Sequence, residues 1–281
     1  MYAVENEELA KYTTMKIGGK ADLFVVPESE DEIITAVRCC LQKKIPYKVL
    51  GNGSNLLISD SGVRGHVIYM KKACQDLFLK DGLVYCGASV MLQRLINFCI
   101  ENNKSAMEYL FSVPATLGGD IVQNAGRGKQ YNKQISDYLA KVRVFDGNKT
   151  VEMSKKDCDF QYRDSIFKHC RNFFVLGAYF DFPFQEREIG EQLKQERINL
   201  VKKNHDAAYP NFGTVFCQGN SRLMRLLKGL RIGKAAFSSK TSNWICNLGG
   251  ATSIDVVRIM KIAIFLHKIT FQKIKTEVEI W

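Results

Sequence analysis

One short stretch constrains this chain more than any other: Gly51-Asn52-Gly53-Ser54-Asn55, directly after the β-like run 47–50. A second glycine loop, Pro114-Ala115-Thr116-Leu117-Gly118-Gly119, follows about sixty residues later. Because glycine lacks a Cβ and tolerates positive φ, two such loops can bring many backbone N–H groups close to a diphosphate. We interpret them as two halves of one cofactor cradle. For the first loop alone, the alternative is a hairpin turn, since Asn-Gly between apolar runs is a common turn signal.

The usual nucleotide-binding motifs do not accompany these loops. The chain contains neither G-x-G-x-x-G nor G-K-[ST], and residues 55–58 and 65–70 are expected to be extended rather than helical. An ordinary Rossmann fold and a P-loop are therefore excluded. A strand at 21–26, a helix from Ser29 and a strand at 47–50 instead predict an α/β unit that leads into the first loop.

Length and composition indicate a globular protein of two or three compact parts. The 281 residues are 46% hydrophobic and 11% aromatic. The N-terminal segment 1–11 is acidic and has no apolar run, and no stretch is long enough to span a membrane. The nine cysteines are an odd number without a C-x-x-C pair, which favours reduced thiols in a cytoplasmic protein over disulfides or a zinc site.

Helix and strand signals alternate along the first part of the chain. Ser29 and Glu32 form a capping-box pattern for a helix that stops at Pro46. Ser89 is expected to cap a helix with an apolar stripe over 92–100. Further strands are expected at 83–86 and 173–182, and a hairpin at 138–151.

The composition changes near residue 185. Residues 185–203 are highly charged with Ile189, Leu193 and Leu200 on one side, which predicts an amphipathic helix at a domain junction. Beyond it we expect a helix over 223–230, a longer helix capped by Thr252 with Asp255 and lined by Val257, Met260 and Ile264, and a final strand at 275–280.

The net charge of +11 is unevenly distributed. Residues 220–281 hold eleven Lys or Arg against Asp255, Glu277 and Glu279, a net +8. A basic face suits an anionic partner, either a nucleotide-sugar or a nucleic acid, and the alternative is a solvated surface. The aromatic residues do not interleave with the basic ones as in a nucleic-acid-binding module, so nucleic acid is not the expected partner.

Three polar segments could carry chemistry: Tyr162-Arg163-Asp164-Ser165, residues 209–216, and Glu277. Each has an ordinary alternative when taken singly, namely a surface ion pair, a turn and a solvated charge. Their combination with the two loops decides the interpretation.

These motifs together resemble the UDP-N-acetylenolpyruvoylglucosamine reductase (UDP-N-acetylmuramate dehydrogenase) family of flavoenzymes, nearly end to end. Residues 13–19 resemble the family's N-T-x-x-I-G-G opening, and 51–57 match its G-x-G-S-N-L-L loop. Residues 114–119 match its P-G-T-x-G-G loop, with Ala115 in place of a glycine. Three further matches are Asn124-Ala125-Gly126, Tyr162-Arg163-Asp164-Ser165 and Thr276-Glu277-Val278.

The resemblance implies an α+β fold. Residues 1–184 would form an FAD-binding domain of the vanillyl-alcohol-oxidase (PCMH) type, made of two α+β subdomains with a break near 70–82. Residues 185–281 would form a C-terminal α+β substrate-binding domain. The residues implied to contact FAD are Gly51, Asn52, Gly53, Ser54, Asn55, Leu56, Pro114, Ala115, Thr116, Gly118, Gly119, Ile121, Asn124 and Gly126.

The implied reaction is the NADPH-dependent reduction of UDP-N-acetylglucosamine enolpyruvate to UDP-N-acetylmuramate in peptidoglycan precursor synthesis. FAD takes a hydride from NADPH and gives it to the vinyl carbon, while a proton goes to the carbon that bears the ether oxygen. Arg163 would hold the substrate carboxylate and stabilise the developing enolate. Thr214 would donate the proton, and Glu277, with a pKa raised by burial, would stabilise or protonate the intermediate. Tyr162 and Asn243 would contact the substrate; no metal is implied.

The chain departs from the family mainly on the substrate side. The family's proton donor is the serine of G-S-x-F-K-N-P, whereas this chain has Gly213-Thr214-Val215-Phe216-Cys217-Gln218-Gly219. Thr214 keeps the hydroxyl and adds a methyl group, while the lysine and the Asn-Pro pair are lost. Cys217 is the stronger acid, but three positions along a strand place it on the opposite face. The family's H-A-N-F corresponds to residues 241–244 without its histidine, and Tyr12 replaces the asparagine before Thr13.

Two other functions stay open at this point. One is the reduction of a different enolpyruvyl sugar, for instance for a surface polysaccharide, and the other is flavin binding without reductase activity. The expected partner is a UDP-sugar enolpyruvyl ether. Neither a nucleic acid nor a membrane is expected to bind, and a monomer is favoured.

Overall fold

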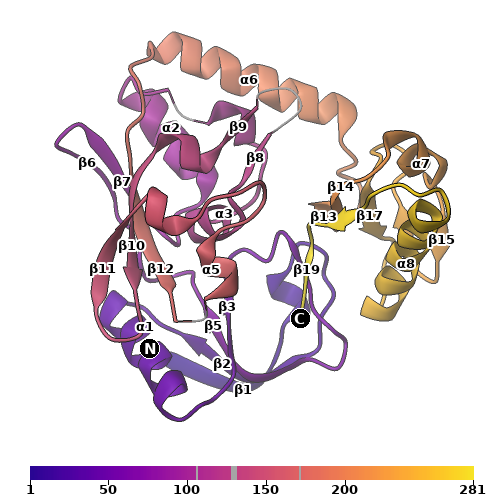
Figure 1. The fold of residues 1–281 in the computed structure, drawn as a ribbon, viewed down its shortest axis with the longest axis horizontal. Helices are drawn as coiled ribbons and strands as arrows, with labels where there is room; N and C mark the ends of the chain where they lie inside the picture. The colour runs from indigo at the N-terminus through magenta and orange to yellow at the C-terminus, as the bar shows by residue number, and fades with distance from the viewer. Residues whose placement is uncertain (106, 128–131, 171) are drawn as a thin grey trace. The chain divides into compact units, whose positions relative to one another are not determined.

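The computed structural model describes residues 1–105, 107–127, 132–170 and 172–281 (Figure 1). The chain forms two compact units, the first from 1–3, 25–51 and 68–201 and the second from 4–24, 52–67 and 202–281. It passes from one unit to the other within β1 (Tyr2–Glu8), β2 (Lys20–Val26) and β5 (Val63–Tyr69). These strands and β3 (Tyr47–Leu50) belong to a sheet ordered β1-β2-β5-β3.

The units divide the chain differently from the predicted boundary at 184/185. Helix α6 (Arg187–Asn204) stays with the first unit as far as residue 201. Two of its side chains explain this, because Arg197 Nε donates to Ser112 Oγ at 2.9 Å and Lys194 Nζ donates to Asn97 Oδ1 at 3.2 Å. The chain re-enters the first unit at Ile68, close to the expected break near 70–82. The assignment of 1–184 to FAD and 185–281 to substrate remains a prediction.

The first unit is built on an antiparallel sheet ordered β11-β10-β12-β7-β6. Its strands are β6 (Leu77–Lys80), β7 (Leu83–Gly87), β10 (Leu139–Phe145), β11 (Thr150–Ser154) and β12 (Phe174–Phe180). The predicted hairpin is confirmed, with Phe145 opposite Thr150. Asp146 closes its turn, because Oδ1 accepts hydrogen bonds from the N–H groups of Asn148 and Lys149, both at 2.8 Å.

Helix capping in this unit confirms one prediction and corrects another. Helix α1 (Glu30–Gln42) begins after Ser29, whose Oγ accepts from the Glu32 N–H at 3.2 Å. Helix α2 (Leu92–Glu101) is capped by Met91 without a side-chain hydrogen bond, so the predicted cap at Ser89 is wrong. Ser89 instead lies in the turn after β7, where its own N–H donates to the Cys74 carbonyl at 3.2 Å.

The predicted apolar face of α6 is also wrong. Ile189 and Leu193 are 46% and 39% exposed, whereas Gly190 and Arg197 are buried. A Cβ on Gly190 would lie 2.9 Å from Ile100 Cγ1, so glycine permits the close approach of α6. The helix therefore packs through a glycine and an arginine rather than through its apolar stripe.

The remaining short elements of the first unit lie around the second glycine loop and the Tyr162–Ser165 segment. They are α3 (Leu117–Gln123), α5 (Ile166–His169), β8 (Gly126–Arg127), β9 (Lys133–Gln134) and the 3-10 turns at Glu108–Leu110, Ile135–Tyr138 and Lys156–Cys158. Helix α3 packs against β7, β12 and α5.

The second unit contains a small sheet and two helices around one apolar core. The sheet is ordered β13-β17-β16-β15, from Asn211–Thr214, Trp244–Asn247, Ala235–Phe237 and Arg231–Ile232. Its helices are α7 (Ser221–Leu226) and α8 (Ser253–Ile269), and the 3-10 turn Ala10–Tyr12 also belongs to it. The predicted capping box of α8 is confirmed, since Thr252 Oγ1 accepts from the Asp255 N–H at 3.1 Å. Of the three residues expected to line α8, Met260 is buried, whereas Ile264 is 38% exposed.

The C-terminal segment forms two short strands instead of the one predicted. Strand β18 (Lys275–Thr276) pairs with β14 (Phe216–Gln218), and β19 (Glu279–Ile280) pairs in parallel with β4 (Leu56–Leu57). The segment changes partner at Glu277 and Val278, whose N–H groups both donate to the Val215 carbonyl. A single chain end thus joins the segment after the first glycine loop to the segment around Thr214.

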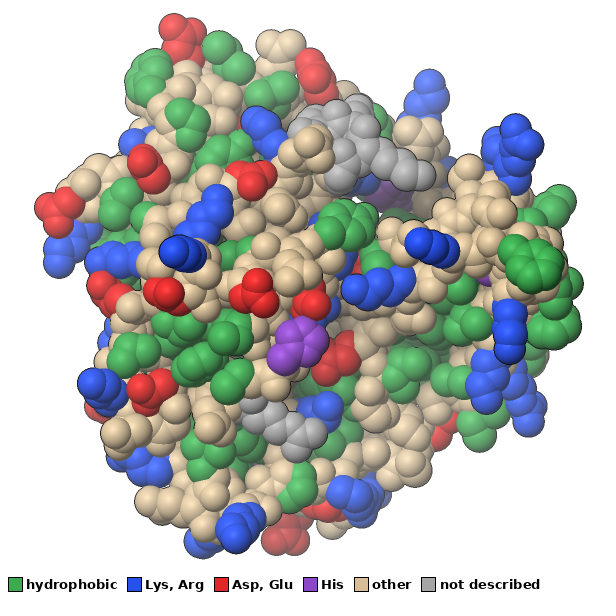
Figure 2. All heavy atoms as spheres, viewed as in Figure 1, with side chains coloured by type: hydrophobic (Ala, Val, Ile, Leu, Met, Phe, Trp, Pro, Cys, Tyr) green, Lys and Arg blue, Asp and Glu red, His purple; other side chains and the backbone are tan. Residues whose placement is uncertain are grey.

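The surface of the helical part of the second unit is mixed in character. Hydrophobic side chains and Lys or Arg side chains lie next to one another over α7 and α8 (Figure 2). Among the described residues, no helix is both long enough and apolar enough to cross a membrane.

Candidate functional site

The two glycine loops touch through Gly51 and Thr116, both in the first unit. A Cβ on Gly51 would lie 2.5 Å from Thr116 Oγ1, closer than two such atoms can approach. Gly51 follows β3, and Thr116 is the N-cap of α3. Residues 65 positions apart in the chain are therefore packed together, which supports their interpretation as parts of one cradle.

Backbone hydrogen bonds fix the second loop to the segment between β7 and α2. The N–H groups of Leu117 and Gly118 donate to the carbonyls of Val90 and Ala88, at 2.9 and 2.8 Å. These two N–H groups donate to other parts of the protein, so they do not face a bound anion. The prediction that the loop's N–H groups approach a diphosphate therefore does not hold for Leu117 and Gly118. Gly118 is needed for close packing, since its Cβ would meet Ala88 Cβ at 3.2 Å.

Gly119 faces open space instead. The nearest atom to a Cβ built on it is Thr116 Oγ1, at 3.7 Å. The absence of a side chain at Gly119 leaves room for a group to approach the backbone beside the Thr116 hydroxyl, whereas the space beside Gly51 is filled by that hydroxyl. The loop thus fits a cofactor with a diphosphate such as FAD, which could be held by Thr116 and Gly119. Pro114 and Ala115 lead into this turn, and Ile121 is buried within α3.

The rest of the first loop lies in the second unit and is held equally tightly. Gly53 has φ of +59°, and a Cβ there would lie 2.4 Å from the Tyr12 carbonyl oxygen. The Gly53 carbonyl accepts from the Thr14 N–H at 3.2 Å. The motif around Thr13 and the glycine loop are therefore parts of one structure. Asn52 and Ser54 are half-buried between these anchors.

Asn55 connects this loop to the expected catalytic glutamate. Its Nδ2 donates to the Glu277 carbonyl at 3.0 Å, and its own carbonyl accepts from the Glu279 N–H at 3.1 Å. Leu56, buried in β4, continues the pairing with Glu279. Hence a residue predicted to bind FAD and a residue predicted to act on the substrate lie side by side in the second unit.

Thr214 lies close to Glu277 in the same unit. Thr214 is exposed at the end of β13, and the Glu277 N–H donates to the carbonyl of the next residue, Val215, at 2.8 Å. Cys217 is turned to β18, with Sγ 3.5 Å from the Lys275 carbonyl oxygen. The structure thus brings together two of the three predicted catalytic residues and directs the cysteine toward the backbone of β18.

Asn243, predicted to contact the substrate, supports the Thr214 segment. Its Nδ2 donates to the Phe216 carbonyl at 2.8 Å, and its Oδ1 accepts from the Phe216 N–H at 3.0 Å. Its own carbonyl accepts from the Val215 N–H at 3.0 Å. Because both ends of the side-chain amide are used, Asn243 is placed to position Thr214.

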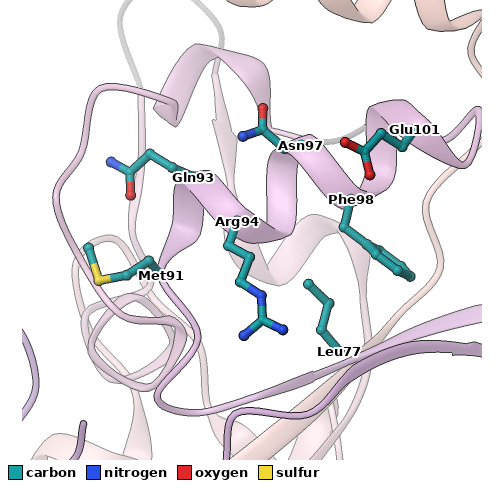
Figure 3. Close-up of a pocket in the computed structure, with 7 residues that line it drawn as sticks. All are labelled: Leu77, Met91, Gln93, Arg94, Asn97, Phe98 and Glu101. Carbon is teal, nitrogen blue, oxygen red and sulfur yellow. The ribbon is translucent and has the colours of Figure 1, made fainter.

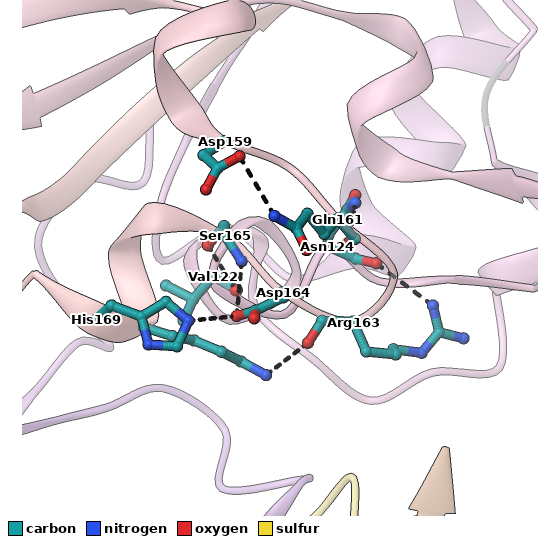
Figure 4. A network of polar contacts seen from close by, with 9 residues as sticks. Val122, Asn124, Asp159, Gln161, Arg163, Asp164, Ser165 and His169 are labelled. Carbon is teal, nitrogen blue, oxygen red and sulfur yellow. Dashed lines mark hydrogen bonds and ion pairs between the residues drawn. The ribbon is translucent and has the colours of Figure 1, made fainter. Parts of the chain in front are cut away.

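Arg163 is the centre of a polar network in the first unit (Figure 4). Its Nη1 donates to the Asn124 carbonyl at 3.3 Å and its Nη2 to the Gly126 carbonyl. Figure 4 shows the guanidinium extending toward Asn124, on the other side of the turn from Asp164 and His169. Two carbonyl acceptors hold the guanidinium in a fixed orientation, and an oriented guanidinium is suited to binding a carboxylate.

The backbone of Arg163 is held in an unusual conformation, with φ of +59°. Reciprocal hydrogen bonds between Gln161 and Asp164, at 3.0 and 3.2 Å, close the turn around it. Tyr162, at the other central position, is 53% exposed, and its ring centroid is 5.0 Å from Arg163 Cζ. Such strain in a non-glycine residue is typical of functional positions.

Asn124 braces this arrangement from α3. It is fully buried, and its Nδ2 donates to the Gln161 carbonyl at 2.8 Å and to Gln134 Oε1 at 3.0 Å. The close approach of β9 requires Gly126, because a Cβ there would lie 2.3 Å from the Lys133 carbonyl oxygen. Both residues were predicted to contact the cofactor, and the contacts made here hold Arg163.

Sequence reasoning missed Asp120, which lies in α3 between the second loop and Asn124. The side chain is 3% exposed, and its Oδ2 has no hydrogen-bond partner among the described residues. Burial raises the pKa of this carboxyl to about 8, although the charge of Arg163 acts in the opposite direction. The sequence signal for it was an acidic residue in an otherwise uncharged helix.

A separate depression of about 540 Å³ lies on the outer side of α2 (Figure 3). It is lined by Leu77 of β6 and by Met91, Gln93, Arg94, Asn97, Phe98 and Glu101. None of these is a predicted site residue, and Arg94 extends toward β6, where Nη1 donates to the Gln75 carbonyl at 3.2 Å. We do not assign the site to this depression. The described residues also include no cluster of side chains suited to a metal ion.

Known proteins share both the sequence and the fold. Residues 21–153 match the family described as FAD binding domain. The UDP-N-acetylenolpyruvoylglucosamine reductase of Desulforamulus reducens is 36% identical over 259 residues, covering 90% of this chain and 84% of the relative. That of Heliobacterium modesticaldum is 32% identical over 265 residues, covering 92% and 83%.

A solved structure agrees with these relatives. The UDP-N-acetylenolpyruvylglucosamine reductase of Thermus caldophilus matches with a TM-score of 0.82 and 29% identity, covering all of this chain and 98% of that one. The predicted α+β fold with an FAD-binding domain is thereby confirmed. Since the likeness extends over nearly the whole length in sequence and structure, the chain belongs to the UDP-N-acetylenolpyruvoylglucosamine reductase family.

Proposed function

We propose that this protein is an FAD-containing, NADPH-dependent reductase that converts UDP-N-acetylglucosamine enolpyruvate to UDP-N-acetylmuramate for peptidoglycan synthesis. The observation that carries the proposal is the fixed Arg163 guanidinium in a chain whose relatives bear this activity in their names. The expected setting is a monomer in the cytoplasm, and the nine cysteines, none of which forms a disulfide among the described residues, are consistent with a reducing compartment.

In this proposal Gly51–Asn55 and Thr116–Gly119 hold FAD. When bound, FAD supplies hydride transfer from NADPH to the vinyl carbon of the substrate. The protein's own residues bind and orient the enolpyruvyl group and deliver the proton. Arg163 binds the carboxylate, onto which negative charge moves during the reaction, and this interaction strengthens as the charge develops.

The proton that completes the reduction goes to the carbon bearing the ether oxygen. We assign its delivery to the Thr214 hydroxyl, with Glu277 acting beside it on the same developing charge. Their common anchor at Val215 supports this pairing. Asn243 is proposed as a positioning residue, because it fixes the backbone of Phe216 after Thr214.

The test is a product assay with the purified protein, FAD and NADPH. UDP-N-acetylglucosamine enolpyruvate is supplied in parallel with a second enolpyruvyl sugar that lacks the UDP group. The proposal expects NADPH consumption with the UDP-sugar only, and a product two hydrogens heavier by mass spectrometry. Equal or greater turnover of the other sugar would assign the site to a different enolpyruvyl substrate.

A further inference from the structure

The outer face of α8 is unusually apolar for a helix exposed to solvent. Its buried side is formed by Val256, Ile259, Met260 and Ala263, which pack into the core of the second unit. Yet Ile254, Phe265 and Ile269 are 56%, 62% and 54% exposed. Large apolar side chains that are exposed together on one face of a helix are suited to a further contact.

The exposed residues form one line along the helix. At 100° per residue, Ile254, Phe265 and Ile269 fall within about 60° of one another, opposite the buried side. Two exposed lysines, Lys261 and Lys268, lie along one side of this line, and the exposed Arg258 lies within it. Phe271, directly after the helix, is 94% exposed.

The basic residues of this region form no ion pairs among the described residues, although Arg258 lies close enough to Asp255 to lower the pKa of that carboxyl. None of the eleven Lys and Arg residues between 220 and 281 takes part in an ion pair among the described residues. Asp255 is the one carboxylate of α8, and it lies in the first turn of the helix. Its Oδ2 accepts a hydrogen bond from the Thr252 N–H at 3.2 Å. The pKa of this carboxyl is lowered, chiefly by that backbone hydrogen bond. Figure 2 shows the resulting mixture of hydrophobic and basic side chains over α7 and α8.

We propose that the outer face of α8, with Phe271, docks peripherally on an anionic phospholipid bilayer. Phe265, Ile269 and Phe271 would enter the boundary between headgroups and acyl chains, and Lys261 and Lys268 would extend to the lipid phosphates. Eight excess positive charges would strengthen the contact. The helix lies along the surface and does not cross it, in agreement with its length and composition.

A bilayer suits this surface better than a single acidic protein. The apolar and cationic groups alternate along about four turns of one helix, without the buried polar anchors that select a defined protein partner. The proposal departs from the expectation from the sequence that no membrane would bind. The inference is independent of the proposed reaction, because none of its residues belongs to the site.

The test measures binding of the FAD-loaded protein to large unilamellar vesicles by co-sedimentation. Phosphatidylcholine vesicles with about one third phosphatidylglycerol are compared with pure phosphatidylcholine vesicles at low ionic strength. Binding is expected only to the anionic vesicles, with a loss in high salt. A Phe265→Trp variant should show a blue-shifted emission component with the same vesicles.

Matched variants distinguish binding through the α8 face from non-specific adsorption to the vesicles. Phe265→Ser with Ile269→Ser should weaken binding about tenfold or more, whereas Phe184→Ser with Ile189→Ser, at 75% and 46% exposed sites on the first unit, should not. Replacing Lys261 and Lys268 by glutamine should weaken it roughly fivefold per lysine. The same change at the exposed Lys155 and Lys156 is the control.

Three results would overturn the proposal: no binding to anionic vesicles at low salt, equal binding to both kinds of vesicle, or wild-type binding by the folded Phe265 and Ile269 variant. Duplex DNA binding that the α8 variants weaken, in the absence of vesicle binding, would assign the surface to nucleic acid instead.

Discussion

Gly51 and Thr116 are in direct contact, although 65 residues separate them in the chain. The space that a Cβ on Gly51 would need is occupied by Thr116 Oγ1, 2.5 Å away. This contact links the end of β3 to the N-cap of α3 and thereby joins the two glycine loops. The proposed FAD site depends on it.

Substitutions on either side of this contact should change FAD binding. Gly51→Ala should displace the Thr116 hydroxyl and weaken FAD binding by about tenfold, since overpacking costs on the order of 1–3 kcal/mol. Thr116→Ala removes the clashing hydroxyl, so the double variant should bind FAD better than Gly51→Ala alone. FAD titration followed by flavin fluorescence measures both. Additive losses in the double variant would show that the two residues do not interact.

Arg163 should matter for the substrate and not for the flavin. Arg163→Ala should retain FAD and lower kcat by about 10²-fold or more, because charge develops on the group that it holds. Arg163→Lys should recover little, since one ammonium cannot reproduce two-pronged binding. Arg38→Ala is the control, because Arg38 also donates to a backbone carbonyl, that of Asn148. Unchanged turnover in Arg163→Ala would remove the assignment.

Substitutions at Thr214 test whether its hydroxyl donates the proton and whether its methyl group slows the reaction. Thr214→Ser removes the extra methyl group, so kcat should rise if the threonine is a hindered donor. Thr214→Val, of similar shape without the hydroxyl, should lower kcat by about 10²-fold. Asn243→Ala should lower kcat less, since it loosens only the backbone beside Thr214. If the serine and valine variants reacted at equal rates, Thr214 would not be the donor.

Asp120 should make stability depend on pH. Burial raises the pKa of its carboxyl from 3.8 to about 8, so the folded protein binds this proton more tightly than the unfolded chain. The contribution of Asp120 to the free energy of unfolding is therefore greatest below about pH 4. It falls as the pH rises toward 8, by up to about 1.4 kcal/mol per pH unit.

The variant Asp120→Asn keeps the shape and abolishes the titration. Its free energy of unfolding, measured in urea with FAD bound, should exceed the wild-type value at pH 8 and differ little at pH 4.5. Asp31→Asn, at an exposed position in α1, is the control. A wild-type advantage at pH 8 would mean that Asp120 is ionised and paired.

The sequence predicted best those features that depend on neighbouring residues. The caps at Ser29 and Thr252 and the hairpin at Asp146 are local hydrogen-bond patterns, and the structure confirms them. The predicted cap at Ser89 is wrong because hydrogen bonds with Cys74 and Gln75 hold Ser89 in the turn between β7 and α2. The predicted apolar face of α6 is wrong because the helix packs through Gly190 and the buried Arg197 instead.

In the candidate site, too, local patterns could be predicted from the sequence and long-range contacts could not. Its motifs could be located from the sequence, but long-range contacts decided what individual residues do. Asn124 and Asn243 use their side-chain amides to hold the segments around Arg163 and Thr214. The buried state of Asp120 could not be inferred, because it depends on how α3 packs against β7 and β12.

The most direct test of the account is an anaerobic reaction in two stages. The flavin of the purified protein is reduced with NADPH, and UDP-N-acetylglucosamine enolpyruvate is then added while the flavin spectrum is recorded. If the proposed function is right, the oxidised spectrum returns rapidly and UDP-N-acetylmuramate is formed. In Glu277→Gln the first stage should be retained and the second lost. Reduced flavin that persists in the wild-type protein after substrate addition would contradict the proposed function.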